Sequence, residues 1–399
     1  MRLTPLHRDA GRLPGSLRLA GHITGDGIPA DEILWVDVPE AYADETTDRL
    51  DAWLLWLLPH AFMAGEDLVL DGPVDADLLR NSHELMEVWA TWHPAGRPVR
   101  LTAEATGADR TNGMRTGLFF TAGVDSFYSL MLHDELTRLH PEWRGRPVDD
   151  LIYVEGYDIP LCNRAELDRK RAALAAVADE TGKTLVTLVT NYRDTSISLR
   201  NAWGPMSHGP ALVAAAHVVG RRWHRLLVSA SFGYDELNPW GSSLVTDPLL
   251  STSATRVEHY GACAGSDRLR KLEFLSRFDV ALQHLHVCWK DGSDRNCGVC
   301  EKCFRTLLAL DLVGARDRAT SFPSGDFDVA TLREVWSDHD LVVRVYERIR
   351  RHALACKRSD VVAIIDECLA RPRPAQPTRP PIRVKEAVID GHRAAKGRG

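Results

Sequence analysis

Six residues, Thr121 to Ser126 (TAGVDS), combine two hydroxyls, a carboxylate and small side chains at a predicted turn between a strand and a helix. The apolar run Leu118 to Phe120 is typical of a strand end, and Phe127 and Leu130 then follow at helical spacing. Backbone N–H groups at the start of a helix point outward and attract anions. We therefore expect this turn to hold phosphate groups, and we call it the phosphate loop.

We assign nucleotide binding to every residue of the phosphate loop: Thr121, Ala122, Gly123, Val124, Asp125 and Ser126. Backbone N–H groups and the Ser126 hydroxyl would contact phosphate oxygens, and Asp125 would help to place Mg²⁺, which makes Asp125 and Ser126 candidate catalytic residues. The loop lacks the lysine with which a Walker loop reaches the outer phosphates, so cleavage of ATP to AMP and pyrophosphate is expected. An ordinary strand-to-helix turn capped by Asp125 or Ser126 is the alternative.

The most specific pattern in the chain is C-x8-C-x2-C-x2-C, formed by Cys288, Cys297, Cys300 and Cys303. Four thiolates at this spacing complete the tetrahedron that a structural zinc prefers, and they leave no open position for a reactive water. Zinc would therefore hold the fold without performing the chemistry. An iron–sulfur cluster is the alternative, although a ferredoxin run would need a cysteine where the chain has Leu307.

The phosphate loop resembles the Ser-Gly-Gly-x-Asp-Ser loop of the N-type ATP pyrophosphatases, with Thr121 in place of the first Ser and Ala122 in place of a Gly. Together with the four cysteines downstream, it resembles the 7-cyano-7-deazaguanine synthases over residues 114 to 315. The resemblance implies ATP-dependent activation of a carboxylate, conversion with ammonia to an amide and a nitrile, and zinc on the four cysteines. ATP, Mg²⁺ and Zn²⁺ are the expected cofactors, and the partners are a small-molecule substrate and ammonia or an amine.

Alternating strand and helix patterns from Met114 to about Gly314 indicate an α/β fold, a Rossmann-like doubly wound parallel sheet with helices on both faces. The carboxyl ends of parallel strands meet at one edge, where ligands bind. Side chains that follow four predicted strands should therefore converge on one crevice: Thr121, Glu155, Asn191 and Ser231. Glu155 and Asn191 are accordingly candidate nucleotide contacts.

A long loop follows the strand predicted over Arg225 to Ser229, and loops of this length are usually functional. Asp235 is the candidate catalytic residue there, with Glu236 and Asp247 as further substrate or magnesium ligands; turn capping is the alternative for all three. His208 is a candidate substrate contact, whereas structural roles are expected for the other scattered histidines, His259 among them.

The chain is divided into four predicted parts. Residues 1–110 form an α+β module that precedes the catalytic domain and is a candidate protein-binding module. Residues 114–315 form the ATP pyrophosphatase domain with its zinc module at 288–303, residues 316–370 form C-terminal helices, and residues 371–399 form a disordered basic tail.

Composition narrows the classes of function. The 399 residues include 44% hydrophobic and 26% charged residues and carry a net charge of −6, which argues against a general nucleic-acid coat. Eight cysteines are too few for a disulfide framework at this length. The sequence contains no apolar window of membrane-spanning length and no signal-peptide core, so we expect a cytoplasmic protein. A homodimer is compatible with the sequence.

Two other functions remain open at this stage. A sulfur transferase of the RNA-thiolating kind also joins such a loop to clustered cysteines, and it would need a reactive thiol at Cys162 or Cys263. A nucleotide-binding regulator without turnover is the second, because Ala122 replaces a glycine. Nucleotide binding without product formation would distinguish the regulator from both enzymes.

Overall fold

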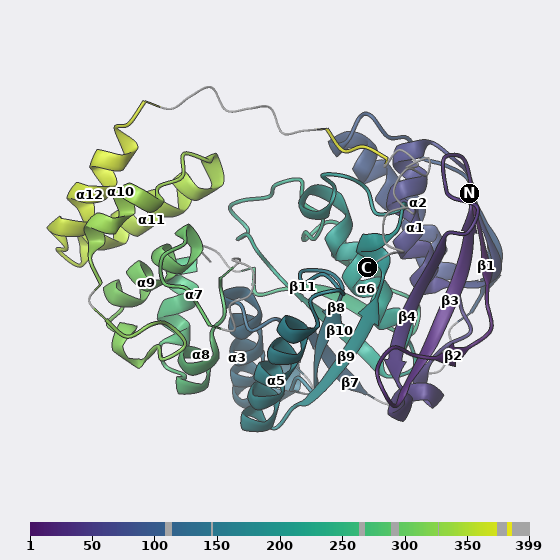
Figure 1. The fold of residues 1–399 in the computed structure, drawn as a ribbon, viewed down its shortest axis with the longest axis horizontal. Coiled ribbons are helices and arrows are strands. Elements are labelled where there is room, and N and C mark those ends of the chain that lie inside the picture. The colour runs from purple at the N-terminus through teal and green to yellow at the C-terminus, as the bar shows by residue number, and fades with distance from the viewer. Residues whose placement is uncertain are drawn as a thin grey trace, which may run out of the picture.

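A computed structural model describes residues 1–107, 114–144, 147–262, 268–288, 295–325, 327–372 and 381–384 of the chain. It is an α/β protein whose largest feature is one mixed, mostly parallel sheet of eleven strands (Figure 1). The strands are β1 (Arg2–Pro5), β2 (Asp9–Ala10), β3 (Ser16–Thr24), β4 (Ile33–Pro39), β5 (Leu68–Asp75), β6 (Leu101–Thr106), β7 (Arg115–Phe119), β8 (Asp150–Glu155), β9 (Thr184–Thr190), β10 (Trp223–Ser229) and β11 (Arg256–Tyr260).

The longer helices flank the sheet or follow it in the chain. They are α1 (Asp51–Ala64), α2 (Ala76–Trp92), α3 (Val124–Leu139), α5 (Arg164–Thr181), α6 (His208–His217), α7 (Arg268–Leu275), α9 (Glu301–Leu312), α11 (Asp340–Ala355) and α12 (Ser359–Leu369). Shorter helices are α4 (Pro141–Arg144), α8 (Asp279–His284) and α10 (Leu332–Val335). Among the described residues, no helix is both long and apolar enough to cross a membrane.

The strands lie in the order β11-β10-β7-β8-β9-β4-β3-β1-β5-β6, with β2 paired to β3. The five strands from β11 to β9 are parallel to one another. Within them β7 lies between β8, the next strand in sequence, and β10, which the chain reaches only after β9. The strand order therefore reverses between β7 and β10, the kind of position at which α/β sheets bind ligands.

The N-terminal strands continue this sheet and do not form one of their own. β4 pairs antiparallel with β9, joining Val36 to Thr190, and β3 and β1 extend the sheet from there. The strands within residues 114–314 are parallel, as predicted, whereas the added N-terminal strands make the whole sheet mixed. The physical reason is that β9 would otherwise present an open edge of unpaired N–H and C=O groups, and β4 satisfies them.

Alternate residues of the parallel strands enter two different apolar clusters, as the two-residue period of a strand requires. Leu118 of β7 packs in the cluster that includes α3 and α5, while Phe119 packs in the cluster that includes α1 and α6. The sequence pattern predicts one apolar face for α1, but its residues from Asp51 to Phe62 are all buried. The helix lies between other elements, so every side is covered.

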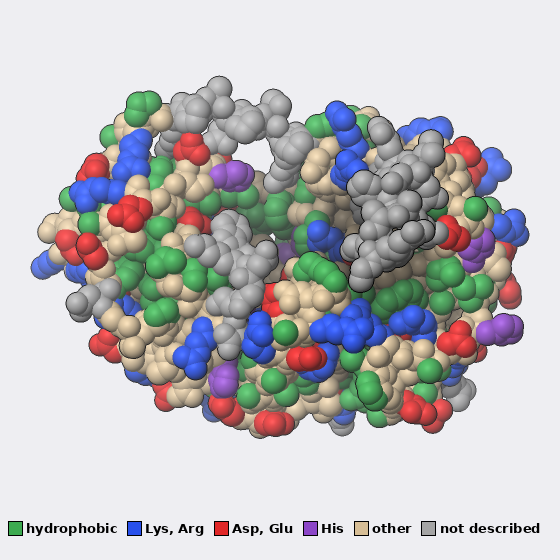
Figure 2. Space-filling model, in the orientation of Figure 1, with side chains coloured by type: hydrophobic (Ala, Val, Ile, Leu, Met, Phe, Trp, Pro, Cys, Tyr) green, Lys and Arg blue, Asp and Glu red, His purple; other side chains and the backbone are tan. Residues whose placement is uncertain are grey.

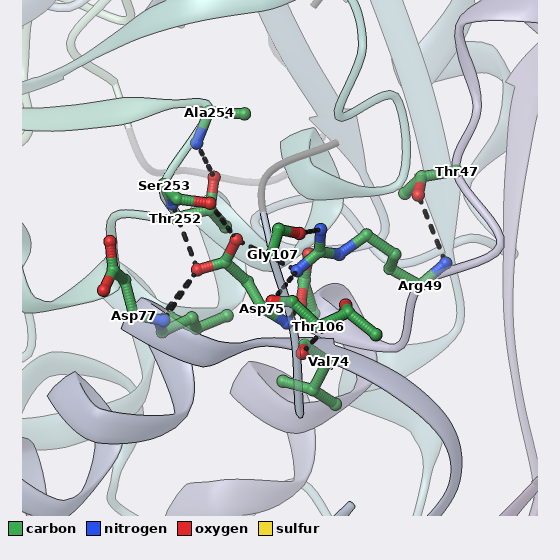
Figure 3. A network of polar contacts seen from close by, with 12 residues as sticks. Thr47, Arg49, Val74, Asp75, Asp77, Thr106, Gly107, Thr252, Ser253 and Ala254 are labelled. Atoms are coloured by element: carbon green, nitrogen blue, oxygen red, sulfur yellow. Dashed lines mark hydrogen bonds and ion pairs between the residues drawn. The ribbon is translucent and has the colours of Figure 1, made fainter. Parts of the chain in front are cut away.

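A buried polar network ties the N-terminal residues to the β10–β11 connection (Figure 3). Asp75 accepts from the backbone N–H groups of Asp77, Leu78 and Ser253 and from the Ser253 hydroxyl. Arg49 forms ion pairs with Asp75 at 2.9 Å and with Asp51 at 3.1 Å. Segments 178 residues apart in sequence are therefore held together by the Asp75 carboxylate.

The chain after α9 forms the lobe that contains α10, α11 and α12, and the molecule is hollowed between this lobe and the sheet (Figures 1 and 2). Pro381 to Val384 return to the side of α1 and α2, where Arg383 and Arg200 exchange backbone hydrogen bonds and Ile382 packs on the core. For these four residues the structure differs from the predicted disordered tail, because backbone pairing and apolar contact offset the cost of ordering them.

Candidate functional site

The phosphate loop connects β7 to α3 at the reversal of strand order. Ala122 has φ of +57°, the left-handed region that a side chain disfavours, and Gly123 is the N-cap residue of α3. Ala122 therefore adopts the conformation for which a glycine would be better suited. The Ser126 hydroxyl donates to the Gly123 carbonyl at 3.1 Å, so in this structure it stabilises the turn.

The Asp125 carboxylate is held by two cations of α7. Lys271 Nζ lies 2.6 Å from its Oδ1 and also donates to the Ala230 carbonyl at the end of β10, while the Arg268 guanidinium lies 3.5 Å from Oδ2. Burial alone would raise the pKa of Asp125, but Lys271 and Arg268 outweigh it and lower the pKa below its ordinary value. Lys271, whose side chain is 2% exposed, thus connects the loop after β7 to the end of β10, the two strands between which the order reverses.

A second lysine contacts the loop from the other side. Lys170 of α5 donates to the Thr121 carbonyl at 2.7 Å, and its Nζ lies 3.2 Å from His286 Nδ1. Burial lowers the pKa of Lys170 to about 8. Lys170, His286 and Ala122 line a cavity of about 310 Å³ to which Arg295 also contributes, so the space beside the loop is rich in basic groups.

Two of the side chains that were expected in the crevice bind other groups of the protein. Glu155 is buried at the end of β8 and is paired with Arg171 at 2.7 Å; burial raises its pKa, and the arginine opposes this. Asn191 donates to the Ile33 carbonyl and accepts from the Trp35 N–H, so both polar atoms of its amide bind the backbone of β4. Their assignment to nucleotide remains a prediction.

The long loop is held by the C-terminal lobe. Arg348 of α11 lies 2.8 Å from Glu236 and 3.9 Å from Asp235, whose side chain is 56% exposed. Asp247 is fully buried and is paired with His259 of β11 at 2.7 Å, not with the arginine. His208 Nδ1 donates to the Trp203 carbonyl, and burial lowers the pKa of His208. The three acidic candidates of this loop therefore do not form a single ligand set.

The four cysteines form a group that could hold a metal ion, since their sulfur atoms lie within 4.8 Å of one another. Cys288 Sγ and Cys300 Sγ are 4.0 Å apart, and Cys297 Sγ and Cys303 Sγ are 3.9 Å apart. A tetrahedron with metal–sulfur bonds of about 2.3 Å would place its sulfurs about 3.8 Å apart. The spacing therefore fits such an ion with little adjustment.

Backbone N–H groups favour the thiolate of one member of the group, Cys297, whereas burial raises the pKa of Cys300 and of Cys303. Burial acts to raise the pKa of Cys297, but the N–H groups of Val299 and Cys300 point at its sulfur and lower the pKa to about 7. Asn296 braces the same segment: its Oδ1 accepts from the N–H groups of Val287 and Cys288, and its Nδ2 donates to two carbonyls. Gly298 has φ of +74°, which the tight turn between two cysteines requires.

Sequence reasoning missed several residues that the structure places here. The basic segment Arg268 to Arg277 predicts a solvated face, with phosphate contact by Arg268 or Lys271 as the alternative, and Asn296 and Lys170 carry no recognisable motif. The only local signal for Asn296 was its place beside Cys297 in the chain. Of the two thiols that a sulfur transferase would use, Cys162 is exposed and Cys263 lies outside the described residues.

Comparisons of the chain with models of protein families, with curated proteins and with solved structures find no match. No family membership follows from them. The resemblance to the 7-cyano-7-deazaguanine synthases therefore remains an expectation that rests on the phosphate loop and the four cysteines.

Proposed function

We propose that this protein is an ATP-dependent ligase that forms AMP and pyrophosphate while activating a carboxylate, and then passes the acyl group to ammonia or an amine. The proposal treats the five parallel strands as a Rossmann-like, doubly wound unit. The observation that carries it is the phosphate loop at the reversal of strand order, with Lys271 and Arg268 beside it. Cations and a helix N-terminus at such a position favour a departing pyrophosphate.

The chain's own groups would act by binding and orientation. The start of α3 offers backbone N–H groups to the phosphates, and Lys271 and Arg268 supply positive charge where negative charge develops. Asp125 is paired with both cations in this structure, so it does not fit the role of a magnesium ligand here, and we derive no step from it. Magnesium would enter with ATP, bound to its phosphates.

Zinc is the metal that we propose for the four-cysteine group, because four thiolates at tetrahedral spacing suit it. Cys288, Cys297, Cys300 and Cys303 would hold it, with Asn296 fixing the backbone around Cys288. When bound, the ion supplies a cross-link between α9 and the segment that follows α8. That segment carries His286, whose N–H donates to the Ala122 carbonyl, so the zinc module would also support the phosphate loop.

The test is to incubate the protein with ATP, Mg²⁺, ammonium and a panel of carboxylates that includes 7-carboxy-7-deazaguanine, and to separate the products by chromatography and mass spectrometry. AMP and an amide or nitrile support the proposal, and ADP as the substrate-dependent product would overturn it. ATP binding without any product would indicate the regulator instead.

A matched pair of glycine variants sharpens this test. A Cβ at Gly123 would meet no atom closer than 3.6 Å, and φ there is −77°, so Gly123→Ala fits the protein without strain. A methyl group would nevertheless obstruct phosphate that approaches the loop backbone. Gly123→Ala should therefore weaken ATP binding about tenfold or more with an unchanged melting temperature, whereas Gly107→Ala, which also meets open space, should leave ATP binding unchanged.

A further inference from the structure

The loop between β10 and β11 lines a pocket of about 170 Å³ that has no part in the ATP chemistry proposed above. Its walls are mainly apolar, from residues such as Phe232, Leu237 and Pro239, and its polar lining includes His259 and Glu236. A single water or ammonia needs only about 30 Å³. The pocket is therefore large enough for an organic molecule with an apolar body.

A buried carboxylate orients the histidine of this pocket. Asp247 is fully buried and its Oδ2 lies 2.7 Å from His259 Nδ1; the Ser242 hydroxyl donates to the same oxygen. Because a carboxylate only accepts, Nδ1 donates to it, and in the neutral imidazole Nε2 is then the nitrogen that keeps a lone pair. The His259 ring is one of the groups that line the pocket, and its side chain is 6% exposed. The pair thus presents a basic nitrogen at the pocket.

The pocket lies at the same edge of the sheet as the phosphate loop. His259 is at the carboxyl end of β11, and the next residue, Tyr260, accepts a hydrogen bond from the Ala230 N–H at the end of β10. The Ala230 carbonyl in turn binds Lys271, the partner of Asp125. Phe232 of the pocket wall is only two residues on, a span of at most about 7 Å. The pocket therefore adjoins the place where ATP would react.

The charge of the lining selects among possible occupants. The pocket-lining residues that the structure describes include the Glu236 carboxylate, and no lysine or arginine is among them. Glu236 is itself paired with Arg348, which lies outside the lining. A second carboxylate would meet no cation inside the pocket, whereas an amine nitrogen can donate to His259 Nε2 and approach Glu236. Nitrogen donors are favoured over acids.

We propose that this pocket binds the amine substrate, an organic amine with an apolar body, and that His259 is the catalytic base that receives its proton. The inference rests on the proposed function. As the amine nitrogen attacks the acyl adenylate, a C–N bond forms and the C–O bond to phosphate breaks. AMP leaves with the electron pair of that bond, and a proton of the nitrogen passes to His259 Nε2. Asp247 is a positioning residue that holds the imidazole and stabilises its charged form.

The test measures binding to the full-length protein by calorimetry, with benzylamine, phenethylamine, cyclohexylamine and butylamine as probes and benzoate for comparison. We expect saturable amine binding that is weakened about tenfold in His259→Gln and unchanged in the control His22→Gln, whose ring makes an exposed hydrogen bond to the Ala30 carbonyl. Leu237→Ser should also weaken binding, and because Leu237 is 67% exposed this variant should fold. No saturable binding of any amine, stronger binding of benzoate, or equal binding by His259→Gln would each overturn the proposal.

A separate experiment tests whether Asp247 positions the His259 ring. In the wild type, nitrogen-15 NMR should show His259 as the Nδ1–H tautomer, and Asp247→Asn should abolish that preference. A spectrum unchanged by Asp247→Asn would overturn the positioning role. Amine binding does not require turnover, while AMP formation from ATP and a carboxylate tests the proposed function, so failure of one is distinguishable from failure of the other.

Discussion

Residue scale: the Asp125–Lys271 pair is the clearest case in which one contact changes what a residue can do. An aspartate in a glycine-containing turn looks like a solvated metal ligand, but here the Asp125 side chain is only 25% exposed and neutralises a buried lysine. Removing its charge would leave Lys271 with the Ala230 carbonyl as its remaining close partner. Function and stability are therefore coupled at this position.

We predict that Asp125→Asn lowers the free energy of unfolding by roughly 1 to 3 kcal/mol, because a buried ammonium loses its counter-ion; the loss is smaller than for a fully buried pair since Asp125 retains some exposure. Urea unfolding measures it. Glu135→Gln is the matched control, because it breaks the exposed pair with Arg277 and should cost at most about 1 kcal/mol. Equal effects of the two substitutions would contradict the role given to Lys271.

Element scale: the four-cysteine group joins the N-terminus of α9 to the segment after α8 through side chains alone. Cys300 is the N-cap residue of α9, and its sulfur accepts from the Cys303 N–H. A metal bound there would therefore set where α9 begins. Binding free energy at such a closed site is folding free energy.

We predict one zinc ion per chain, its loss in Cys300→Ser, and a lower melting temperature for that variant. Elemental analysis and thermal unfolding measure these effects. Cys356→Ser is the control, since Cys356 is exposed at the end of α11 and should affect neither quantity. Iron and sulfide in anaerobically purified protein would contradict the zinc assignment.

The stability of the junction between α1 and β5 should depend on pH because of the Asp51 carboxyl group. Burial raises its pKa from 3.8 to about 6, against the Asp75 N–H and Arg49, which lower it. Between these two values the folded chain holds a proton that the unfolded chain has released, so the stability contributed by this group falls as pH rises from about 4 to 6.

We predict that wild-type stability relative to Asp51→Asn decreases by roughly 3 kcal/mol over that pH interval, because a shift of one pKa unit corresponds to about 1.4 kcal/mol. Urea unfolding of both proteins at several pH values from 4 to 7 measures the difference. A difference that is constant over the interval would show that the carboxyl group titrates alike in the folded and unfolded chains.

Whole-molecule scale: one sheet and one apolar cluster include both the N-terminal residues and the parallel strands. Val36 and Trp56 lie in the same cluster as Ile152 and Leu226. Without residues 1–107, the edge of β9 and one face of the sheet would be uncovered. The N-terminal segment thus completes the fold of the region that carries the candidate site.

We predict that a fragment of residues 114–399 does not unfold cooperatively when expressed alone, and that co-expression with residues 1–107 restores a soluble complex. Calorimetry and size-exclusion chromatography measure the two results. Cooperative unfolding of the isolated fragment near the temperature of the full chain would show instead that the two parts are autonomous.

Local patterns in the sequence were enough to predict the α/β class, four parallel strands of the sheet and the cysteine group. Each depends on residues close together in the chain, such as the spacing of Cys297, Cys300 and Cys303 or the apolar run before Thr121. A turn or a metal-binding knuckle is formed by near neighbours, so its spacing is visible in the sequence.

Only the tertiary structure decided which distant groups meet. Lys271 reaches Asp125 across 146 residues, Ser253 reaches Asp75 across 178, and β4 pairs with β9. Even the twelve-residue separation of Asp247 and His259 gave no signal, because a turn of chain and a new strand, β11, bring them together. Such contacts depend on how apolar faces pack and strands align over long loops, and residue spacing alone does not encode that arrangement.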